Sequence, residues 1–331
     1  RNTALVVFGL VGAFMHIINH GLFKPLLFLG SGVVIHATGT REIDRMGGLA
    51  RRLPRSAPIF LVGSLAICGL PPLNGFVGEL FLYFGAFNDA VASPTPILAL
   101  ITPLLAIVGG IAVITFVKLF GVVFLGSPRT TAAAQGHEVG GAMTAPMGLL
   151  AILCVAAGVV SPLLLELVEP VVCFYGGVSS PRFSQLTGMV PLVTISMVNG
   201  SLLILVLLGG GIYRKMVSRM PQASTATWGC GYLAPTPRIQ YTGTSFSESA
   251  TRLLGVIAVP ERHYPCLSAI MPGPSRFRYA VTETILDRLL APFFLQVGHA
   301  FSYVRRLQHG HLHLYMLYIF ATLFVLMLLP H

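Results

Sequence analysis

Residues 14–24 read Phe-Met-His-Ile-Ile-Asn-His-Gly-Leu-Phe-Lys and place His16, His20 and Lys24 within the apolar run 4–35. Spacings of four and eight residues put these three side chains on one face of a helix, one turn above another. The run is apolar enough to lie in a bilayer, where a charged group costs about 2.5–3.5 kcal/mol on insertion scales. The pattern therefore predicts a file of titratable groups in the membrane, whose simplest function is to move protons.

Three other interpretations of this helix compete with a proton relay. The two histidines have a spacing that can bind a metal ion, although no third ligand is evident in the sequence. Lys24 can extend its amine towards the membrane surface, although its mid-span position is deep for that. The third alternative is a histidine in a protein core with its hydrogen bonds satisfied, which is common for a single residue but not for three aligned groups. In addition, Pro25 cannot donate to the carbonyl of Gly21, which leaves an acceptor where a water can bind.

The composition is typical of a membrane protein. Mean hydropathy is +0.80, hydrophobic residues make up 54% of the chain and charged residues only 10%. The net charge of +10 is concentrated in short segments between apolar runs, as the positive-inside rule describes for cytoplasmic loops. Among the five cysteines there is no Cys-x-x-Cys pair, so neither a disulfide framework nor a metal knuckle is indicated. We expect contact with a lipid bilayer and none with nucleic acid.

The apolar runs predict an all-α polytopic membrane protein with about six transmembrane helices, one of them broken at mid-membrane. The segment 39–55 carries five arginines against two acidic residues and is best placed in the cytoplasm. Alternation from that segment puts loops 38–57, 126–143 and 213–309 in the cytoplasm and a loop at 167–188 outside. The expected spans are 3–37, 58–87 with an interruption at 68–75, 96–125, 146–166, 189–212 and 311–329.

The long segment 213–309 contains 11 of the 21 basic residues. Residues 228–243 are rich in turn formers and aromatic residues without periodicity, which predicts an ordered loop. Residues 276–306 predict an amphipathic helix that breaks near Pro292 and lies on the membrane surface or against partner helices. Packing of this segment on its own bundle is an equally weighted alternative.

A second candidate site is Glu79, about one turn after a helix break. Residues 69–79 read Gly-Leu-Pro-Pro-Leu-Asn-Gly-Phe-Val-Gly-Glu. Unwound backbone at this depth is tolerated where it is buried in protein or lines a water-filled cavity, and transporters place ion sites at such breaks. The alternative is that Glu79 is a fixed partner of a lysine. Two interpretations are equally open for Lys118, in span 96–125: it is part of a proton exit, or its side chain extends to the membrane surface.

Together these motifs resemble a known family. The order His16-x-x-x-His20-x-x-x-Lys24, then Gly39-Thr-Arg with Met-Gly-Gly-Leu, then the 69–79 motif, is similar to the antiporter-like subunits of respiratory complex I and of Mrp antiporters. Trp228-x-Cys-Gly-Tyr and Pro-Thr-Pro-Arg-x-Gln-Tyr at 235–241 resemble the branch of that family formed by the membrane subunits of hydrogenase-4 and formate hydrogenlyase.

The resemblance implies a bundle of about fourteen helices built from two inverted repeats and extended by two C-terminal helices. Residues 1–166 are then the C-terminal part of the antiporter-like domain, and 167–331 are the extension, two transmembrane helices joined by a cytoplasmic loop and an amphipathic helix. The chain starts at Arg1 rather than Met, so we expect it to be part of a longer protein of a bacterial or archaeal cell (inner) membrane. His16, His20 and Lys24 correspond to the central hydrophilic axis, and Glu79 to the broken-helix position.

The same resemblance implies a proton-translocating membrane subunit of a hydrogenase-type, complex I-like oxidoreductase. Its partners are other membrane subunits and, through them, a peripheral nickel–iron hydrogenase-like arm. No cysteine cluster for an iron–sulfur centre and no glycine-rich nucleotide loop is evident, so we expect this chain to bind no cofactor and no metal. The alternatives are an Mrp-type Na⁺/H⁺ antiporter subunit without redox coupling and a scaffold that transports nothing.

Overall fold

The computed structural model describes most of the chain as two compact units, residues 1–247 and 248–331. The predicted boundary at residue 166, between the antiporter-like domain and the extension, follows from the family resemblance and stays a prediction. The motif at 228–232, part of the predicted loop 228–243, lies outside the described residues. The residues described are 3–92, 100–219, 236–237, 239–253, 255, 260–265, 278–281, 285–305 and 310–328.

The first helix, α1 (Thr3–Thr38), confirms the predicted span 3–37. It continues through Pro25, which transmembrane helices tolerate because neighbouring groups satisfy the freed carbonyl. The helix ends where Gly39 adopts a left-handed φ of 67° and its N–H donates to the carbonyl of Ile35 at 2.7 Å. Only glycine takes this conformation without steric cost, so the end of α1 is encoded locally.

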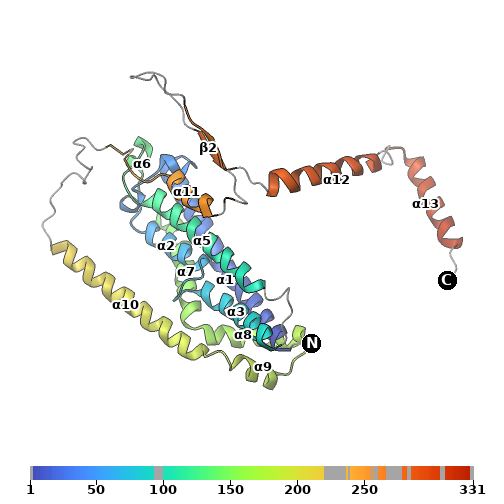
Figure 1. The fold of residues 1–331 in the computed structure, drawn as a ribbon, viewed down its shortest axis with the longest axis horizontal. Helices are drawn as coiled ribbons and strands as arrows, with labels where there is room; N and C mark the ends of the chain where they lie inside the picture. The colour runs from blue at the N-terminus through green and yellow to red at the C-terminus, as the bar shows by residue number, and fades with distance from the viewer. Residues whose placement is uncertain are drawn as a thin grey trace. The chain divides into compact units, whose positions relative to one another are not determined.

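The predicted break in the second span is confirmed. The span consists of α2 (Ser56–Ile67) and α3 (Asn74–Ala92), separated by residues 68–73. Gly69, with φ of 64°, terminates the first half, and its N–H donates to the carbonyl of Ala66 at 3.2 Å. Among the helix pairs, α1 packs most extensively against α3, and the two run side by side in the bundle (Figure 1).

The predicted span 146–166 is wrong as a single helix. Helix α7 (Gly141–Val159) ends within this span, and α8 (Ser161–Gly176) begins two residues later. Pro162 lies in the first turn of α8, where its missing N–H is harmless, whereas within a continued α7 it would leave the carbonyl of Gly158 without its helical partner. The predicted loop 167–188 is also largely helical, because α8 is followed by α9 (Ser180–Thr187), at a bend of 118°.

Four helices are long and apolar enough to cross a membrane, or five if the bent α8–α9 pair is one span, among the residues described. The four are α1, α5 (Ile101–Phe124), α7 and α10 (Leu192–Arg219). Of the other predicted spans, 58–87 is the broken α2–α3 pair and 311–329 is α13 (Leu312–Leu328), which has 17 residues. The prediction of a polytopic helical membrane protein is confirmed, with these differences in the individual spans.

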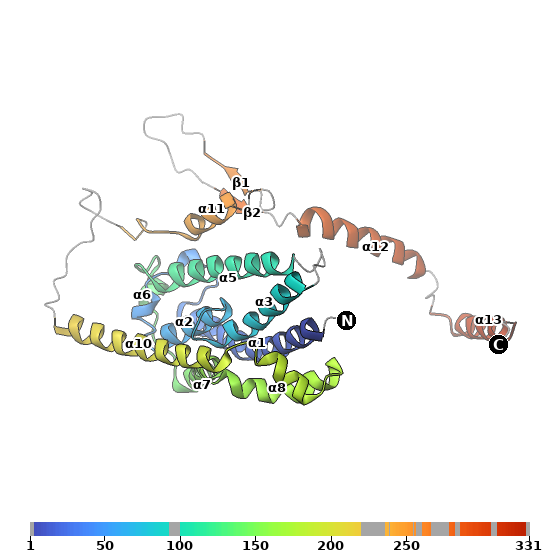
Figure 2. The same cartoon turned by 60° about the horizontal axis from the view of Figure 1, so that its bottom comes forward.

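Two hydrophobic clusters form the core of the first unit. One joins the second half of α1 to α2, the end of α5 and α7, with the ring centroids of Phe60 and Phe124 5.2 Å apart. The other joins the first half of α1 to α3, α8 and α9, with Phe8 and Phe81 fully buried. Helix α10 contacts α7 and α8, and its buried residues are Leu192 and Asn199; Figure 2 shows that it leaves the bundle towards its C-terminal end.

Two of the predicted cytoplasmic loops, 38–57 and 126–143, meet at one end of the bundle, which we call the basic end. It contains three short helices, η1 (Ile43–Arg45), η2 (Leu49–Arg51) and α6 (Thr131–Gln135). The N–H of Gly48 donates to the carbonyl of Leu125 at 2.8 Å. Loops 38–57 and 126–143 therefore lie on the same side, as the charge pattern predicts.

Glu138, at the basic end, caps the start of α2 from a distant part of the chain. Its carboxylate accepts hydrogen bonds from the N–H of Arg55 at 2.7 Å and from the N–H and hydroxyl of Ser56 at 3.2 and 2.6 Å. Burial acts to raise the pKa of Glu138, but the hydrogen bonds from Ser56, Arg55 and Val139 outweigh it, so the pKa lies below its ordinary value. The carboxylate supplies the acceptor that the unpaired N–H groups of a helix start require.

Helix α11 (Gly243–Leu253) begins in the first unit and ends in the second. In the second unit β1 (Pro260–His263) pairs antiparallel with β2 (Arg278–Val281), and the Thr251 hydroxyl contacts the Tyr279 hydroxyl at 2.9 Å. The predicted amphipathic helix 276–306 is therefore wrong at its start, where the chain forms a strand. Its helical part is the π-helical turn η3 (Leu286–Leu290) and α12 (Ala291–Val304). The helix does not break at Pro292, which lies in the first turn of α12.

Candidate functional site

His16 and His20 lie one turn apart on α1, as their spacing predicts. Their ring centroids are 6.1 Å apart. The ring of Phe23 contacts both, at 5.5 Å from His20 and 6.3 Å from His16. His16 is half-buried and His20 is exposed within this chain. The two imidazoles are too far apart for a direct hydrogen bond, so a proton passes between them only with an intervening group such as water.

Lys24 continues the same helix, and its amine lies 5.9 Å from the centroid of the Phe28 ring on the next turn. A cation over an aromatic face is attracted by the ring quadrupole. No acidic side chain forms an ion pair with Lys24 among the residues described. The side chain is half-buried, and the described residues provide no fixed counter-ion for it.

Glu79 lies on α3, with its carboxylate against the backbone of Gly69 across the helix break. A Cβ at Gly69 would lie only 2.7 Å from Oε2 of Glu79, so glycine leaves the space that the carboxylate occupies. Within the described residues Glu79 forms no ion pair with a lysine, and the alternative of a fixed lysine partner gains no support there. The sequence identified Glu79 but missed Gly69, for which the signal was a glycine shortly before two prolines.

Asn19 and Asn74 form a buried amide pair between α1 and the start of α3, and both were missed by sequence reasoning. The Asn19 side chain donates to the carbonyl of Asn74 at 2.8 Å, and the Asn74 side chain donates to the carbonyl of Asn19 at 3.5 Å. They are 1% and 0% exposed. Their Oδ1 atoms have no hydrogen-bond partner in the described part of the chain. Buried acceptors of this kind are normally satisfied, so these two oxygens are available to a water molecule or another hydrogen-bond donor.

The Asn19–Asn74 pair lies between the two groups of titratable residues. Asn19 falls between His16 and His20 on α1, and Asn74 is the first residue of the helix that carries Glu79. The helices approach closely here, since a Cβ at Gly78 would lie 3.3 Å from the backbone nitrogen of His16. Over the described ranges no direct hydrogen bond joins Glu79 to the histidines or Lys24, so any connection between them passes through water or other bound groups.

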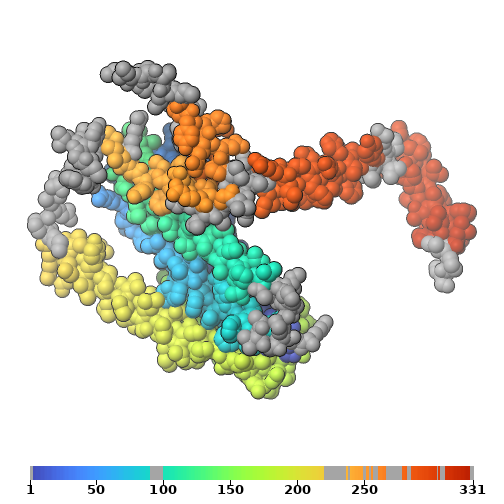
Figure 3. All heavy atoms as spheres, in the orientation of Figure 1, coloured from blue at the N-terminus to red at the C-terminus, as the bar shows by residue number. Residues whose placement is uncertain are grey.

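Lys118, the remaining predicted site residue, lies on α5, a helix that forms part of the molecular surface in Figure 3. Its amine donates to the hydroxyl of Ser247 at 2.6 Å. Ser247 lies near the start of α11, 129 residues further along the chain. The structure therefore gives Lys118 a polar partner that its position in the sequence did not suggest.

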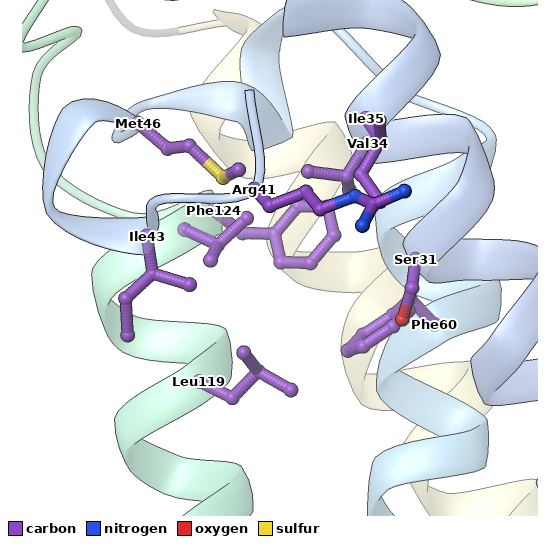
Figure 4. Close-up of a pocket in the computed structure, with 10 residues that line it drawn as sticks. Ser31, Val34, Ile35, Arg41, Ile43, Met46, Phe60, Leu119 and Phe124 are labelled. Carbon is purple, nitrogen blue, oxygen red and sulfur yellow. The ribbon is translucent and has the colours of Figure 1, made fainter. Parts of the chain in front are cut away.

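A cavity of about 230 Å³ lies between α1, α2 and α5 at the basic end. Figure 4 shows the side chain of Arg41 across it, above Phe60, Phe124 and Leu119. The five predicted site residues do not line this cavity. In the residues described, no group of three or more His, Cys, Asp or Glu side chains is arranged to hold a metal ion, so a metal at His16 and His20 would lack a third ligand from them.

Comparisons with known proteins identify relatives of this arrangement. The family model described as "NADH:quinone oxidoreductase/Mrp antiporter, TM" matches residues 3–90, the part that contains α1, α2 and most of α3. Hydrogenase-4 component B of Escherichia coli (strain K12) is 33% identical over 347 residues, covering 98% of this chain and 50% of that protein. Formate hydrogenlyase subunit 3 of the same organism is 37% identical over 234 residues, covering 69% of this chain and 37% of that protein.

A solved structure has a similar fold. It is a chain of the membrane-bound sulfane sulfur reductase (MBS), an archaeal respiratory membrane complex, with a TM-score of 0.54 and 21% sequence identity. The match covers 96% of this chain and 47% of that chain. The chain thus spans about half the length, or less, of the proteins it matches.

Proposed function

We propose that this chain, whose residues 3–90 match the NADH:quinone oxidoreductase/Mrp antiporter transmembrane family, is a proton-translocating membrane subunit of a hydrogenase-type, complex I-like oxidoreductase. The similarity to hydrogenase-4 component B extends over 98% of the chain and includes the C-terminal extension. That extent favours the hydrogenase branch over an Mrp-type Na⁺/H⁺ antiporter, whose membrane residues would be nearly the same.

One observation carries the proposal. Helix α1 carries His16, His20 and Lys24, and α3, which follows the break, carries Glu79. These two helices pack against each other most extensively, with the buried Asn19–Asn74 pair between them. Ionisable groups within transmembrane helices are costly and mark ion or proton pathways. A helix broken at membrane depth is tolerated where it is buried in protein or lines a water-filled cavity.

In the proposed mechanism, protons move along α1 and cross to α3. Imidazole accepts a proton at one ring nitrogen and releases one from the other, so His16 and His20 transfer protons along the helix. Water held by the free Oδ1 atoms of Asn19 and Asn74 would link this file to the Glu79 carboxylate. The charge of Lys24 changes the proton affinity of its neighbours, and redox chemistry in partner subunits supplies the energy for that change.

We propose that this chain holds no redox cofactor itself. The partners would be other membrane subunits and, through them, a peripheral nickel–iron hydrogenase-like arm that carries the electron transfer. The protein would be a multi-pass component of the cell membrane with the basic end of the bundle in the cytoplasm. In the whole protein, residues from the remaining half would complete the proton path.

The test replaces Glu79 with Gln and Lys24 with Ala in the full-length protein within its complex. Redox turnover and proton uptake are measured together in sealed membrane vesicles, with and without Na⁺. Glu166→Gln is the control, because Glu166 is an exposed carboxylate of α8. We expect proton movement to fall in both site variants and to be unchanged in the control. Unchanged turnover and pumping in both site variants would refute the relay, and Na⁺-driven proton movement without redox turnover would favour the antiporter.

A further inference from the structure

We propose that Ser247 is the hydroxyl through which protons pass between Lys118 and water at the basic end of the bundle. This inference rests on the proposed function, because it assigns one end of the proton path. It makes a segment of the C-terminal extension part of that path. We call residues 239–247 the latch segment.

The first observation is the contact itself. The Lys118 amine donates to the Ser247 hydroxyl at 2.6 Å, and the pair is partly buried. Lys118 precedes the end of α5 by six residues, about 9 Å at the rise of an α-helix. Across the described ranges Lys118 has no acidic partner. Its polar neighbour is therefore a group that both accepts and donates hydrogen bonds.

The second observation is that the start of α11 is packed against α5 next to this contact. The ring of Phe246 lies over Gly121, one turn beyond Lys118, and a Cβ at Gly121 would lie 3.1 Å from Cζ of Phe246. A larger residue at position 121 would displace the ring. The absence of a side chain there lets Ser247 approach the Lys118 amine.

The third observation is that hydrogen bonds hold the latch segment to both loops of the basic end. The side-chain amide of Gln240 accepts from the N–H of Ser127 at 3.0 Å and donates to the carbonyl of the same residue at 3.0 Å. The N–H of Gly243 donates to the Asp44 carboxylate at 2.7 Å. Two loops far apart in sequence therefore fix the position of the segment.

Arg129 adds a further attachment. Its guanidinium donates to the carbonyls of Val122 at 2.8 Å and Met46 at 3.1 Å, and to the carbonyl of Tyr241 in the latch segment at 2.7 Å. One side chain thus joins the end of α5, the loop after α1 and the latch segment. Charge-assisted hydrogen bonds are stronger than neutral ones, so the segment that carries Ser247 is firmly placed.

The chemistry requires one proton transfer through the hydroxyl. A proton leaves Nζ of Lys118 for Oγ of Ser247 while the hydroxyl proton of Ser247 passes to a water molecule. One N–H bond and one O–H bond break, and two O–H bonds form, so the serine is unchanged and one positive charge moves from the lysine to water. The reverse order loads Lys118 from the cytoplasmic water. A side chain that only holds the amine, without exchanging a proton, cannot do this.

The test compares Ser247→Ala with Ser247→Thr in the full-length protein within its complex. Proton uptake and redox turnover are measured in the same sealed vesicles, so their ratio is independent of the amount of assembled complex. We expect Ala to lower the protons moved per turnover about tenfold, the scale of one lost charge-assisted hydrogen bond. Thr should restore the ratio because it retains the hydroxyl. Ser218→Ala is the control, since the Ser218 hydroxyl donates within α10 to the carbonyl of Lys215 at 2.9 Å.

Three outcomes overturn the inference. A wild-type ratio for Ser247→Ala shows that the hydroxyl carries no protons, and a Thr variant as defective as Ala shows that the hydroxyl is not what matters. An equal loss for Ser218→Ala also overturns it. Glu79→Gln and Lys24→Ala, measured in parallel, separate the two proposals. If these variants stop pumping while Ser247→Ala does not, only the role of Ser247 is wrong, whereas normal pumping by both contradicts the proposed function.

Discussion

Replacing Gly69 with Ala tests whether the position of the Glu79 carboxylate matters, without changing any titratable group. Gly69 adopts φ of 64° at the break, and a Cβ there would lie 2.7 Å from Oε2 of Glu79 and 3.0 Å from its Cδ and Oε1. Ordinary van der Waals contact begins near 3.4 Å. One of the two groups must therefore move by about 0.7 Å. The carboxylate will move, because it is the end of a flexible side chain, whereas the backbone at Gly69 is held in place.

Two separable costs follow from this geometry. The left-handed backbone costs about 1–2 kcal/mol for an alanine, whatever surrounds it. The displacement of the carboxylate acts on function instead, since a misplacement of about 1 Å can cost about 100-fold in rate. We expect proton movement in Gly69→Ala to fall by about 10- to 100-fold, with a loss of stability of about 1–2 kcal/mol.

Gly39→Ala is the matched control. Gly39 has φ of 67° and nothing within 4 Å of an added Cβ, so the variant carries the same backbone cost without touching Glu79. Stability is measured as thermal unfolding of the purified protein, and proton uptake is measured in vesicles. Both variants should lose similar stability, but only Gly69→Ala should lose proton movement. If the two variants pump equally well, or fail equally, the position of the carboxylate does not control transfer and this prediction is wrong.

Three further predictions concern stability. Glu138→Ala should lower the free energy of unfolding by about 1 kcal/mol, the value of a helix cap. Folding lowers the pKa of Glu138, so the stability advantage of the wild type should be full above the unfolded-state pKa and should vanish as pH falls through the folded-state pKa. Thermal unfolding measured across acidic pH will check this. Asn19→Ala should cost about 0.6–1.7 kcal/mol, the range for hydrogen bonds between transmembrane helices, and an unchanged unfolding temperature would contradict the bond to Asn74. Gly158→Ala should be destabilised by about 1–3 kcal/mol or fail to assemble, since its Cβ would overlap the carbonyl of Pro72, whereas Gly148→Ala, with its nearest contact at 4.0 Å, should retain wild-type detergent stability and yield.

Some errors of the sequence prediction have a local physical cause. The span 146–166 was predicted from hydropathy alone, which does not register that Pro162 ends one helix and starts another. The strand Arg278–Val281 was predicted as helix because Arg, Tyr and Ala suit both structures. Its pairing with Pro260–His263 decided between them, and such pairing is not visible in a local pattern.

The amino-acid sequence alone was enough to establish a helical membrane bundle, the helix that carries His16 and His20, and the place where the helix before Glu79 breaks. These features depend on local chemistry: apolar run length, a helical period of 3.6 residues, and the backbone limits of glycine and proline. The polar partners emerged from the packed helices: Asn19 with Asn74, 55 residues apart, and Lys118 with Ser247, 129 residues apart. A hydrogen bond requires two atoms about 3 Å apart, and which distant residues reach that distance depends on how the helices pack.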